Sequence, residues 1–148
     1  MSQAVAVFNT RSVKGIVTLK ERKAGLYIEA IFTELPEGEH GFHIHKAGDL
    51  RGEGCKLACD HYHKGPPCNH GGPPTHPGPR HTGDLGNVRE NVKYTYTLKD
   101  VLIADVLGRS FIVHAKPDDY GKGGFDDSLI TGHSGARIAC SIIGRVEC

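Results

Sequence analysis

Short apolar segments rich in β-branched residues recur along the chain and are separated by polar, charged or glycine-containing turns. They cover residues 4–8, 15–19, 26–32, 41–45, 92–98, 110–114 and 136–143. Segments of this length and composition are typical of strands, and no convincing ten-residue amphipathic stretch indicates a helix between them. The spacing predicts an all-β domain, an antiparallel sandwich or flattened barrel of seven or eight strands.

Two long segments interrupt the strand pattern. Residues 46–80 hold six of the eight prolines and four histidines without hydrophobic periodicity, and residues 116–135 form a second glycine-rich excursion. Loops of this length are uncommon inside a compact domain unless something ties them down. We therefore expect both loops to be anchored.

The composition narrows the classes of partner. The chain has 148 residues, with 18 Lys and Arg against 17 Asp and Glu, and so a formal net charge of +1. This length suits a single domain, residues 1–148. Balanced charge leaves no basic stripe for nucleic acid or an anionic membrane surface, and no apolar run is long enough for a transmembrane helix. The first residues show no secretory signal, so we expect a cytoplasmic protein.

Histidine is the unusual part of this composition. Ten His accompany five Cys, one Met and no Trp, and imidazole is the commonest metal ligand in proteins. No two cysteines are spaced Cys-x-x-Cys, so a four-cysteine zinc ribbon and a thioredoxin-like motif are both unsupported. The composition points to metal chemistry carried by histidine.

Three candidate ligands lie on predicted strands. His43 and His45 project to the same face because successive side chains of a strand alternate, and His114 ends another apolar run, where a long loop can meet its ring. Taken singly, exposed surface histidines or a structural histidine would give the same pattern.

Four further candidate ligands come from the first long loop and its end. They are His61, His70, His81 and Asp84. Metal binding by these side chains would replace the hydrophobic anchor that the loop lacks, because closing a loop around a metal turns binding energy into folding energy.

Several motifs occur in the order seen in copper/zinc superoxide dismutases, and the chain resembles that family from about residue 4 to residue 146. The matching segments are Gly41-Phe42-His43-Ile44-His45, Gly48-Asp49, Gly54-Cys55, His61, His70-Gly71-Gly72-Pro73, Arg80-His81-Thr82-Gly83-Asp84-Leu85-Gly86-Asn87, Val113-His114, Asp118-Asp119-Tyr120-Gly121-Lys122-Gly123-Gly124 and Gly135-Ala136-Arg137-Ile138-Ala139-Cys140. The resemblance implies a Greek-key β-sandwich or flattened barrel of about eight antiparallel strands with two long functional loops. This family is itself a known example of the sandwich, of electrostatic steering and of near-diffusion-limited catalysis.

The resemblance also implies two metal sites that share one ligand. It places copper on His43, His45, His61 and His114, and zinc on His61, His70, His81 and Asp84. Four imidazoles suit Cu(II), and three imidazoles with a carboxylate suit tetrahedral zinc. His61 would bind through both ring nitrogens, which requires loss of a proton that two flanking dications make possible. The implied enzyme converts two superoxide anions and protons to dioxygen and hydrogen peroxide as copper cycles between Cu(II) and Cu(I).

Two charged residues complete the implied site. Arg137 matches the guanidinium beside the copper, where its planar fork could bind and orient a small anion. Asp118 resembles the carboxylate that links His43 to His70 and fixes the orientation of both rings. Without the resemblance, a surface arginine and an exposed loop acid would be the simpler interpretations.

The cysteines match the family only in part. Cys55 and Cys140 correspond to its intrasubunit disulfide, which would stabilise the fold by roughly 4 to 5 kcal/mol on the chain-entropy account, although disulfides are unusual in a reducing cytosol. Cys59 and Cys68 lie outside the pattern and could be free thiols or a second bridge, and Cys148 is expected to be free.

Three departures from the family leave alternatives open. His63 could compete with His61 as the shared ligand, and His76 is a rival zinc ligand to His70. The spacing from Cys55 and the His-Gly-Gly match favour His61 and His70, so His63 and His76 are expected on solvent, as is His133. His40 falls on the same strand face as Phe42 and Ile44, so we do not expect it to join His43 and His45.

The third departure concerns the charged loop that guides the anion. Asp126, Asp127 and Thr131 match this loop, but Ile130 stands where a lysine is common. Loss of a cation at the entrance should lower the association rate modestly, mainly at low salt.

The resemblance further implies superoxide as substrate and a homodimer formed through one flat sandwich face and the loop around Leu50. Two other functions compete with catalysis: delivery or storage of copper by a dismutase-like domain, and a purely zinc-stabilised interaction domain. The chain keeps all four copper histidines and Arg137, which delivery proteins of this type usually lack in part. A zinc-only domain leaves the same-face pair His43 and His45 unexplained.

Overall fold

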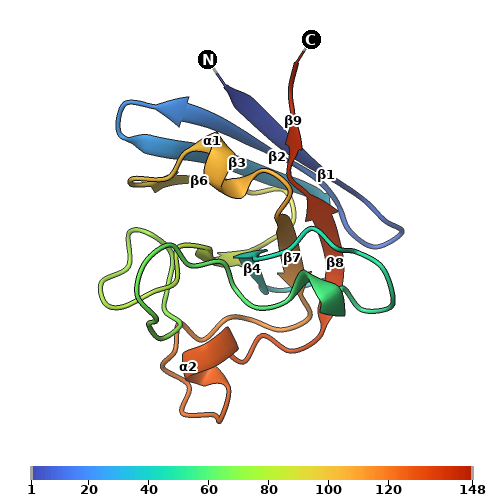
Figure 1. Cartoon of the computed structure of the whole chain (residues 1–148). Helices are drawn as coiled ribbons and strands as arrows, with labels where there is room; N and C mark the ends of the chain where they lie inside the picture. Colours follow the sequence, from blue (N-terminus) through green and yellow to red (C-terminus); the bar gives the residue numbers. More distant parts are fainter. Residues whose placement is uncertain (1, 148) are drawn as a thin grey trace.

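The computed structural model describes residues 2–147, which form two antiparallel sheets joined by long loops (Figure 1). In chain order the strands are β1 (Gln3–Asn9), β2 (Lys14–Arg22), β3 (Gly25–Glu34), β4 (His40–His45), β5 (Asp84–Val88), β6 (Lys93–Leu98), β7 (Ser110–His114), β8 (Arg137–Ile142) and β9 (Gly144–Arg145). Three short helical turns, η1 (Lys56–Ala58), α1 (Ile103–Val106) and α2 (Ser128–Thr131), lie in the loops. The expectation for Cys148 falls outside the described residues.

The strand order confirms the predicted all-β sandwich. One sheet has the order β6-β3-β2-β1-β9 and the other β5-β4-β7-β8, with antiparallel pairing throughout residues 2–147. The chain changes sheet after β3, β5, β6 and β8, which gives the crossing connections of a Greek-key sandwich. The apolar pattern missed β5, whose sequence is polar and glycine-containing, and the two-residue β9.

The core lies between the sheets, and its aromatic centre explains why β4 can carry the site. Phe32, Phe42 and Phe111 are fully buried, with ring centroids 5.5 Å apart for Phe32 and Phe42 and 5.2 Å apart for Phe42 and Phe111. Phe42 points into this core, so the histidines on either side of Ile44 point to the opposite face. Every residue of β4 is nevertheless buried, because loops cover that opposite face.

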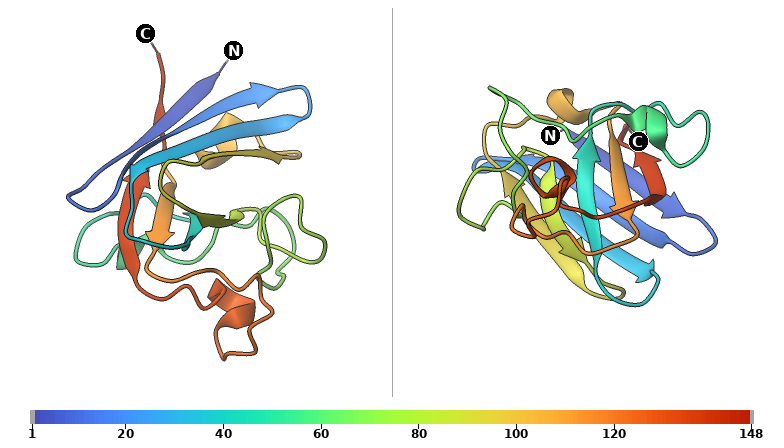
Figure 2. Two further views of the ribbon diagram at one scale, coloured as in Figure 1. Left: turned by 180° about the vertical axis from the view of Figure 1, so that it is seen from behind. Right: turned by 90° about the horizontal axis from the view of Figure 1, so that it is seen from below.

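Both long loops lie on the side of the four-stranded sheet away from the five-stranded one (Figures 1 and 2). The first loop is fastened by the disulfide between Cys55 and Cys140, whose Cα atoms are 6.2 Å apart, and by an isolated bridge between His45 and His61. The second loop carries α2 and closes over the same face. No helix among residues 2–147 has the length and apolar character needed to cross a bilayer.

Candidate metal centre

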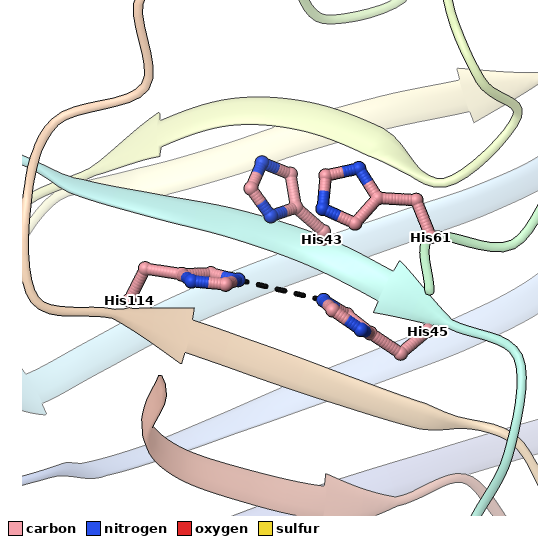
Figure 3. Close-up of side chains that lie close together, drawn as sticks. All are labelled: His43, His45, His61 and His114. Atoms are coloured by element: carbon pink, nitrogen blue, oxygen red, sulfur yellow. Dashed lines mark hydrogen bonds between the residues drawn. The ribbon is translucent and has the colours of Figure 1, made fainter. Parts of the chain in front are cut away.

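Four buried histidines meet above β4 and the end of β7. His43 and His45 come from β4, His114 ends the neighbouring β7, and His61 is brought alongside by its bridge to His45 (Figure 3). Each ring offers one nitrogen to a group whose atoms all lie within 4.8 Å of one another. The structure therefore brings together the whole set predicted for copper.

The hydrogen bonds of His45 and His114 fix which ring nitrogen carries the proton. The Nδ1 atom of His45 donates to the carbonyl of Cys59 at 2.7 Å, and that of His114 donates to the carbonyl of Gly135 at 3.1 Å. A carbonyl can only accept, so the Nε2 atom of each neutral ring carries a lone pair and no proton. Burial keeps these rings neutral: it lowers the pKa of His45 well below its usual value and that of His114 to about 4.

These two lone pairs point at each other, which is the observation that fits a metal. The Nε2 atoms of His45 and His114 are 3.4 Å apart (Figure 3). Nδ1 of His43 and Nε2 of His61 are also buried and without a hydrogen-bond partner. Buried acceptors are costly unless a donor or a cation satisfies them, so the donor set fits a copper ion.

A second cluster surrounds the carboxylate of Asp84. Its Oδ1 atom is 2.9 Å from Nδ1 of His61 and 3.0 Å from Nδ1 of His70, and its Oδ2 atom is 3.4 Å from Nδ1 of His81. Burial raises the pKa of Asp84, but its hydrogen bonds with the three imidazoles outweigh this effect and hold the pKa far below the usual range. A carboxylate and three imidazoles are a zinc donor set.

His81 is the loosest member of this second cluster. Its Nδ1 atom is buried without a partner, and its Nε2 atom donates to the carbonyl of Cys68 at 2.9 Å. The group around Asp84 whose ligand atoms lie within 4.8 Å of one another contains His43, His61 and His70. His81 lies outside this group, so its role as a zinc ligand stays a prediction.

Comparison with known proteins agrees with this donor chemistry. The sequence model of the family described as copper/zinc superoxide dismutase matches residues 13–143. Superoxide dismutase (Cu-Zn) A of Xenopus laevis is 39% identical over 97% of this chain and 98% of its own length. The enzyme of Paramecium bursaria Chlorella virus 1 is 41% identical over 91% of this chain and 74% of its own. The solved structure of the clock protein EA4 has a TM-score of 0.83 and 36% identity, and the match covers 97% of this chain and 94% of that one.

The chain belongs to the copper/zinc superoxide dismutase family. Copper and zinc are accordingly its cofactors, and its enzyme class is that of an oxidoreductase acting on superoxide. The family also includes a relative with another name: the copper chaperone for superoxide dismutase of Mus musculus is 38% identical over 98% of this chain, which spans 54% of that protein.

Asp118 joins the two clusters. Its carboxylate accepts from Nε2 of His43 at 2.5 Å and from Nε2 of His70 at 2.8 Å. Burial lowers the pKa of His70, but hydrogen bonds to Asp118 and Asp84 outweigh burial and raise it to about 9. Because Asp118 occupies the outer nitrogen of each ring, the inner nitrogen of each is left to face a metal.

Two residues that support Asp118 escaped the sequence interpretation. Asn87 clamps the backbone of Asp118: its Oδ1 atom accepts from the backbone N–H at 2.7 Å, and its Nδ2 atom donates to the carbonyl at 3.0 Å. Gly132 has a φ of +76°, and a Cβ atom there would collide with Oδ1 of Asp118 and Nε2 of His70. Both lie in segments that the resemblance covers, but nothing in the residue types alone signals these roles.

Arg137 and the disulfide meet at the rim of the copper group. The Nη1 atom of Arg137 donates to the carbonyl of Cys55 at 2.9 Å, and Cys55 is bonded to Cys140. The disulfide thus positions the carbonyl that orients the guanidinium. Cys59 and Cys68 are free thiols rather than a second bridge.

The rival ligands lie outside both clusters. His63 has both nitrogens occupied, because Nδ1 accepts from the backbone N–H of Thr82 at 3.0 Å and Nε2 donates to the carbonyl of Pro66 at 2.9 Å. His76 packs against Tyr120, with ring centroids 4.9 Å apart. Neither belongs to a metal-binding group within residues 2–147.

The expectation that His133 sits on solvent holds in part, because its side chain is 35% exposed. Its ring stacks on Phe125 with centroids 3.7 Å apart, and its Nδ1 atom lies 2.7 Å from Oδ1 of Asp127. These contacts brace the loop that carries α2. His63 and His76 are likewise half-buried rather than exposed. His40, as expected, stays out of the copper group and contacts the carbonyls of Pro36 and His114.

Replacing His61 by alanine should reduce tight occupancy of both metals, because one ring serves both clusters. The matched control is His63→Ala, two residues away, which should retain copper and zinc because that ring faces neither cluster. Metal content per chain, measured by mass spectrometry after dialysis, distinguishes the two variants. Normal copper and zinc content in His61→Ala would contradict the shared-ligand assignment.

Proposed function

We propose that this chain dismutates superoxide at the rim of the four-histidine group, with copper on His43, His45, His61 and His114 and zinc on His61, His70, His81 and Asp84. The facing lone pairs of His45 and His114 carry the proposal, because a metal cation bound between them would satisfy both. Copper, when bound, would supply the one-electron redox chemistry that the side chains lack.

Arg137 is the residue proposed to bind the anion. Its guanidinium is half-buried and tethered by one N–H to Cys55, which leaves other N–H groups of the fork available to a small anion. Burial lowers its pKa somewhat, but an arginine stays charged at neutral pH. A fixed positive charge beside the four histidines would hold superoxide in place without rearrangement during the reaction.

His61 is proposed to hold and release a proton at Nε2. Its Nδ1 atom lies against Asp84 in the zinc cluster, while Nε2 is buried, unpartnered and turned to the copper group. Burial lowers the pKa of His61, so the ring keeps Nε2 free of a second proton near neutral pH. A proton gained at Nε2 would be placed next to the anion that needs it.

The main alternative is copper delivery without turnover. The mouse copper chaperone is about as similar to this chain as the dismutases are, but this chain spans only about half of it. The Xenopus dismutase matches almost end to end. The intact set of four copper histidines with Arg137 favours catalysis.

We further propose that residues 1–148 form one domain that works as a homodimer in the cytoplasm. Cross-strand neighbours Val7, Ile16 and Ile31 form a row on the outer face of the five-stranded sheet and are 56%, 50% and 41% exposed. Apolar rows of this kind are suited to a subunit interface.

The free thiols of Cys59 and Cys68 favour a reducing compartment, although an extracellular dismutase of Drosophila melanogaster is 40% identical over 89% of the chain.

The decisive test of function is superoxide consumption by the purified protein together with its copper and zinc content. We expect both metals, catalytic consumption of superoxide, and loss of activity after a copper chelator with recovery when copper is restored. Zinc alone, with no activity after copper is supplied, would favour the interaction domain. Copper and zinc at full occupancy without turnover would favour delivery or storage.

Arg137→Ala should lower the second-order rate constant with superoxide by about tenfold or more, because it removes a preorganised cation from the binding site. Arg137→Lys keeps the charge but loses the planar fork, so its rate constant should lie between those of the wild type and Arg137→Ala. Metal content and thermal unfolding should remain those of the wild type. An Arg137→Ala enzyme with full metal content and undiminished rate would show that Arg137 does not bind the substrate.

Ile16→Glu should shift the protein toward monomers, since it buries a charge at the centre of the proposed interface. Sedimentation of this variant and of Ile130→Glu separates a specific effect from a general change of charge, because Ile130 is also exposed, at 60% against 50% for Ile16, and lies in α2 outside the five-stranded sheet. Monomeric wild-type protein at micromolar concentration would overturn the homodimer.

A further inference from the structure

A cavity of about 370 Å³ opens beside the shared ligand His61 and is bordered by both long loops. Its lining includes His61 and His81 from the metal clusters, and Leu129 and Ile130 from α2. Ile130 is 60% exposed. The position where the family commonly has a lysine therefore presents an uncharged side chain to a space that reaches the metal ligands.

Lys46 and Asp60 are the only Lys, Arg, Asp or Glu residues that line this cavity in the described chain. Both are attached to the metal ligands through the backbone: Lys46 follows His45, Asp60 precedes His61, and the N–H of Lys46 donates to the carbonyl of Asp60 at 2.9 Å. The carbonyl of Lys46 also accepts from Nη1 of Arg109 at 2.8 Å. Two opposite charges thus stand at fixed backbone positions beside the site.

The charge of Lys46, which borders the cavity, is not paired with a carboxylate in the described chain. Lys46 is exposed and takes part in none of the ion pairs formed within residues 2–147. Lys64, by contrast, is held by the carboxylate of Asp105 at 2.9 Å and is not among the residues that border the cavity. An unpaired charge acts on an approaching anion at full strength, whereas a paired one is largely cancelled.

We propose that Lys46 supplies the cation that steers superoxide toward the site in place of the missing cation at position 130, and that the opposed charge of Asp60 limits this effect. The inference rests on the proposed dismutase function and assigns to this chain its own steering pair. Superoxide carries one negative charge, and a local positive potential raises the association rate of such a substrate until salt screens it.

Charge reversal at Lys46 is the test, with Lys20→Glu as the matched control. Lys20 lies on β2 in the five-stranded sheet, is exposed and, like Lys46, is absent from the ion pairs of residues 2–147, so it gives the same change of net charge far from the metals. Second-order rate constants with superoxide would be measured by pulse radiolysis on copper- and zinc-loaded protein from about 10 mM to about 300 mM ionic strength, a range over which the Debye length falls several-fold.

At the lowest ionic strength we expect Lys46→Glu to be about threefold slower than the wild type and Lys20→Glu to be nearly unchanged. The difference should shrink as salt is added. Asp60→Asn should be faster than the wild type and should show a steeper salt dependence. A structural defect would not follow this pattern, because lost metal or altered geometry lowers the rate at every salt concentration.

Three results would overturn the inference. They are equal rates for Lys46→Glu and Lys20→Glu, a slow Lys46→Glu enzyme whose deficit persists at high salt with full metal content, and an Asp60→Asn enzyme no faster than the wild type at low salt. All three presuppose an active wild type. A fully metal-loaded wild type that does not consume superoxide would instead overturn the proposed function itself.

Discussion

The imidazole of His61 lies between two sets of metal-binding atoms, and the arrangement of the outer loops depends on it. One nitrogen lies against the carboxylate of Asp84 and the other turns to the four-histidine group. The backbone bridge to His45 fixes the ring beside β4. A proline-rich loop with no hydrophobic periodicity is thereby attached to the core of the sandwich through His61 and the ions it can bind, in addition to the disulfide between Cys55 and Cys140.

The loops in turn determine the chemistry of the rings. Carbonyl groups of Cys59, Cys68 and Gly135 each accept a hydrogen bond from the outer nitrogen of a candidate ligand. Each of these hydrogen bonds leaves the inner nitrogen with a lone pair. Metal affinity and loop conformation are therefore coupled in both directions. If the loop moved, these rings would lose the hydrogen bonds that fix both their orientation and the nitrogen that carries the proton.

Much of this arrangement could be predicted from the sequence, and the omissions have physical reasons. Alternation in a strand placed His43 and His45 on one face, and the order of motifs assembled the remaining ligands. Strand β5 was missed because only Leu85 and Val88 of its five residues are apolar, although both lie in the core. The tie from Asn87 to Asp118 spans 31 residues, and local patterns do not report such distant contacts.

The rival histidines show the limit of residue type as evidence. His61 and His63 differ by two positions and are equally good ligands in isolation. In the fold, Thr82 and Pro66 occupy both nitrogens of His63, while one nitrogen of His61 has no protein partner. The distinction comes from neighbours on a different part of the loop, so only the tertiary structure resolves it.

The carboxylates of Asp84 and Asp118 give the two ends of one dense group of imidazoles different electrostatic character. Asp118 and Asp84 flank His70 and raise its pKa to about 9, so this half of the centre favours positive charge. Within residues 2–147 neither His45 nor His114 is paired with a carboxylate, and burial lowers the pKa of His114 to about 4. A site that holds a permanent charge suits zinc, which has no redox chemistry. An ion that cycles between two oxidation states loses one positive charge when it is reduced. A site of mostly neutral nitrogen ligands does not oppose that loss, because it places little negative charge beside the ion.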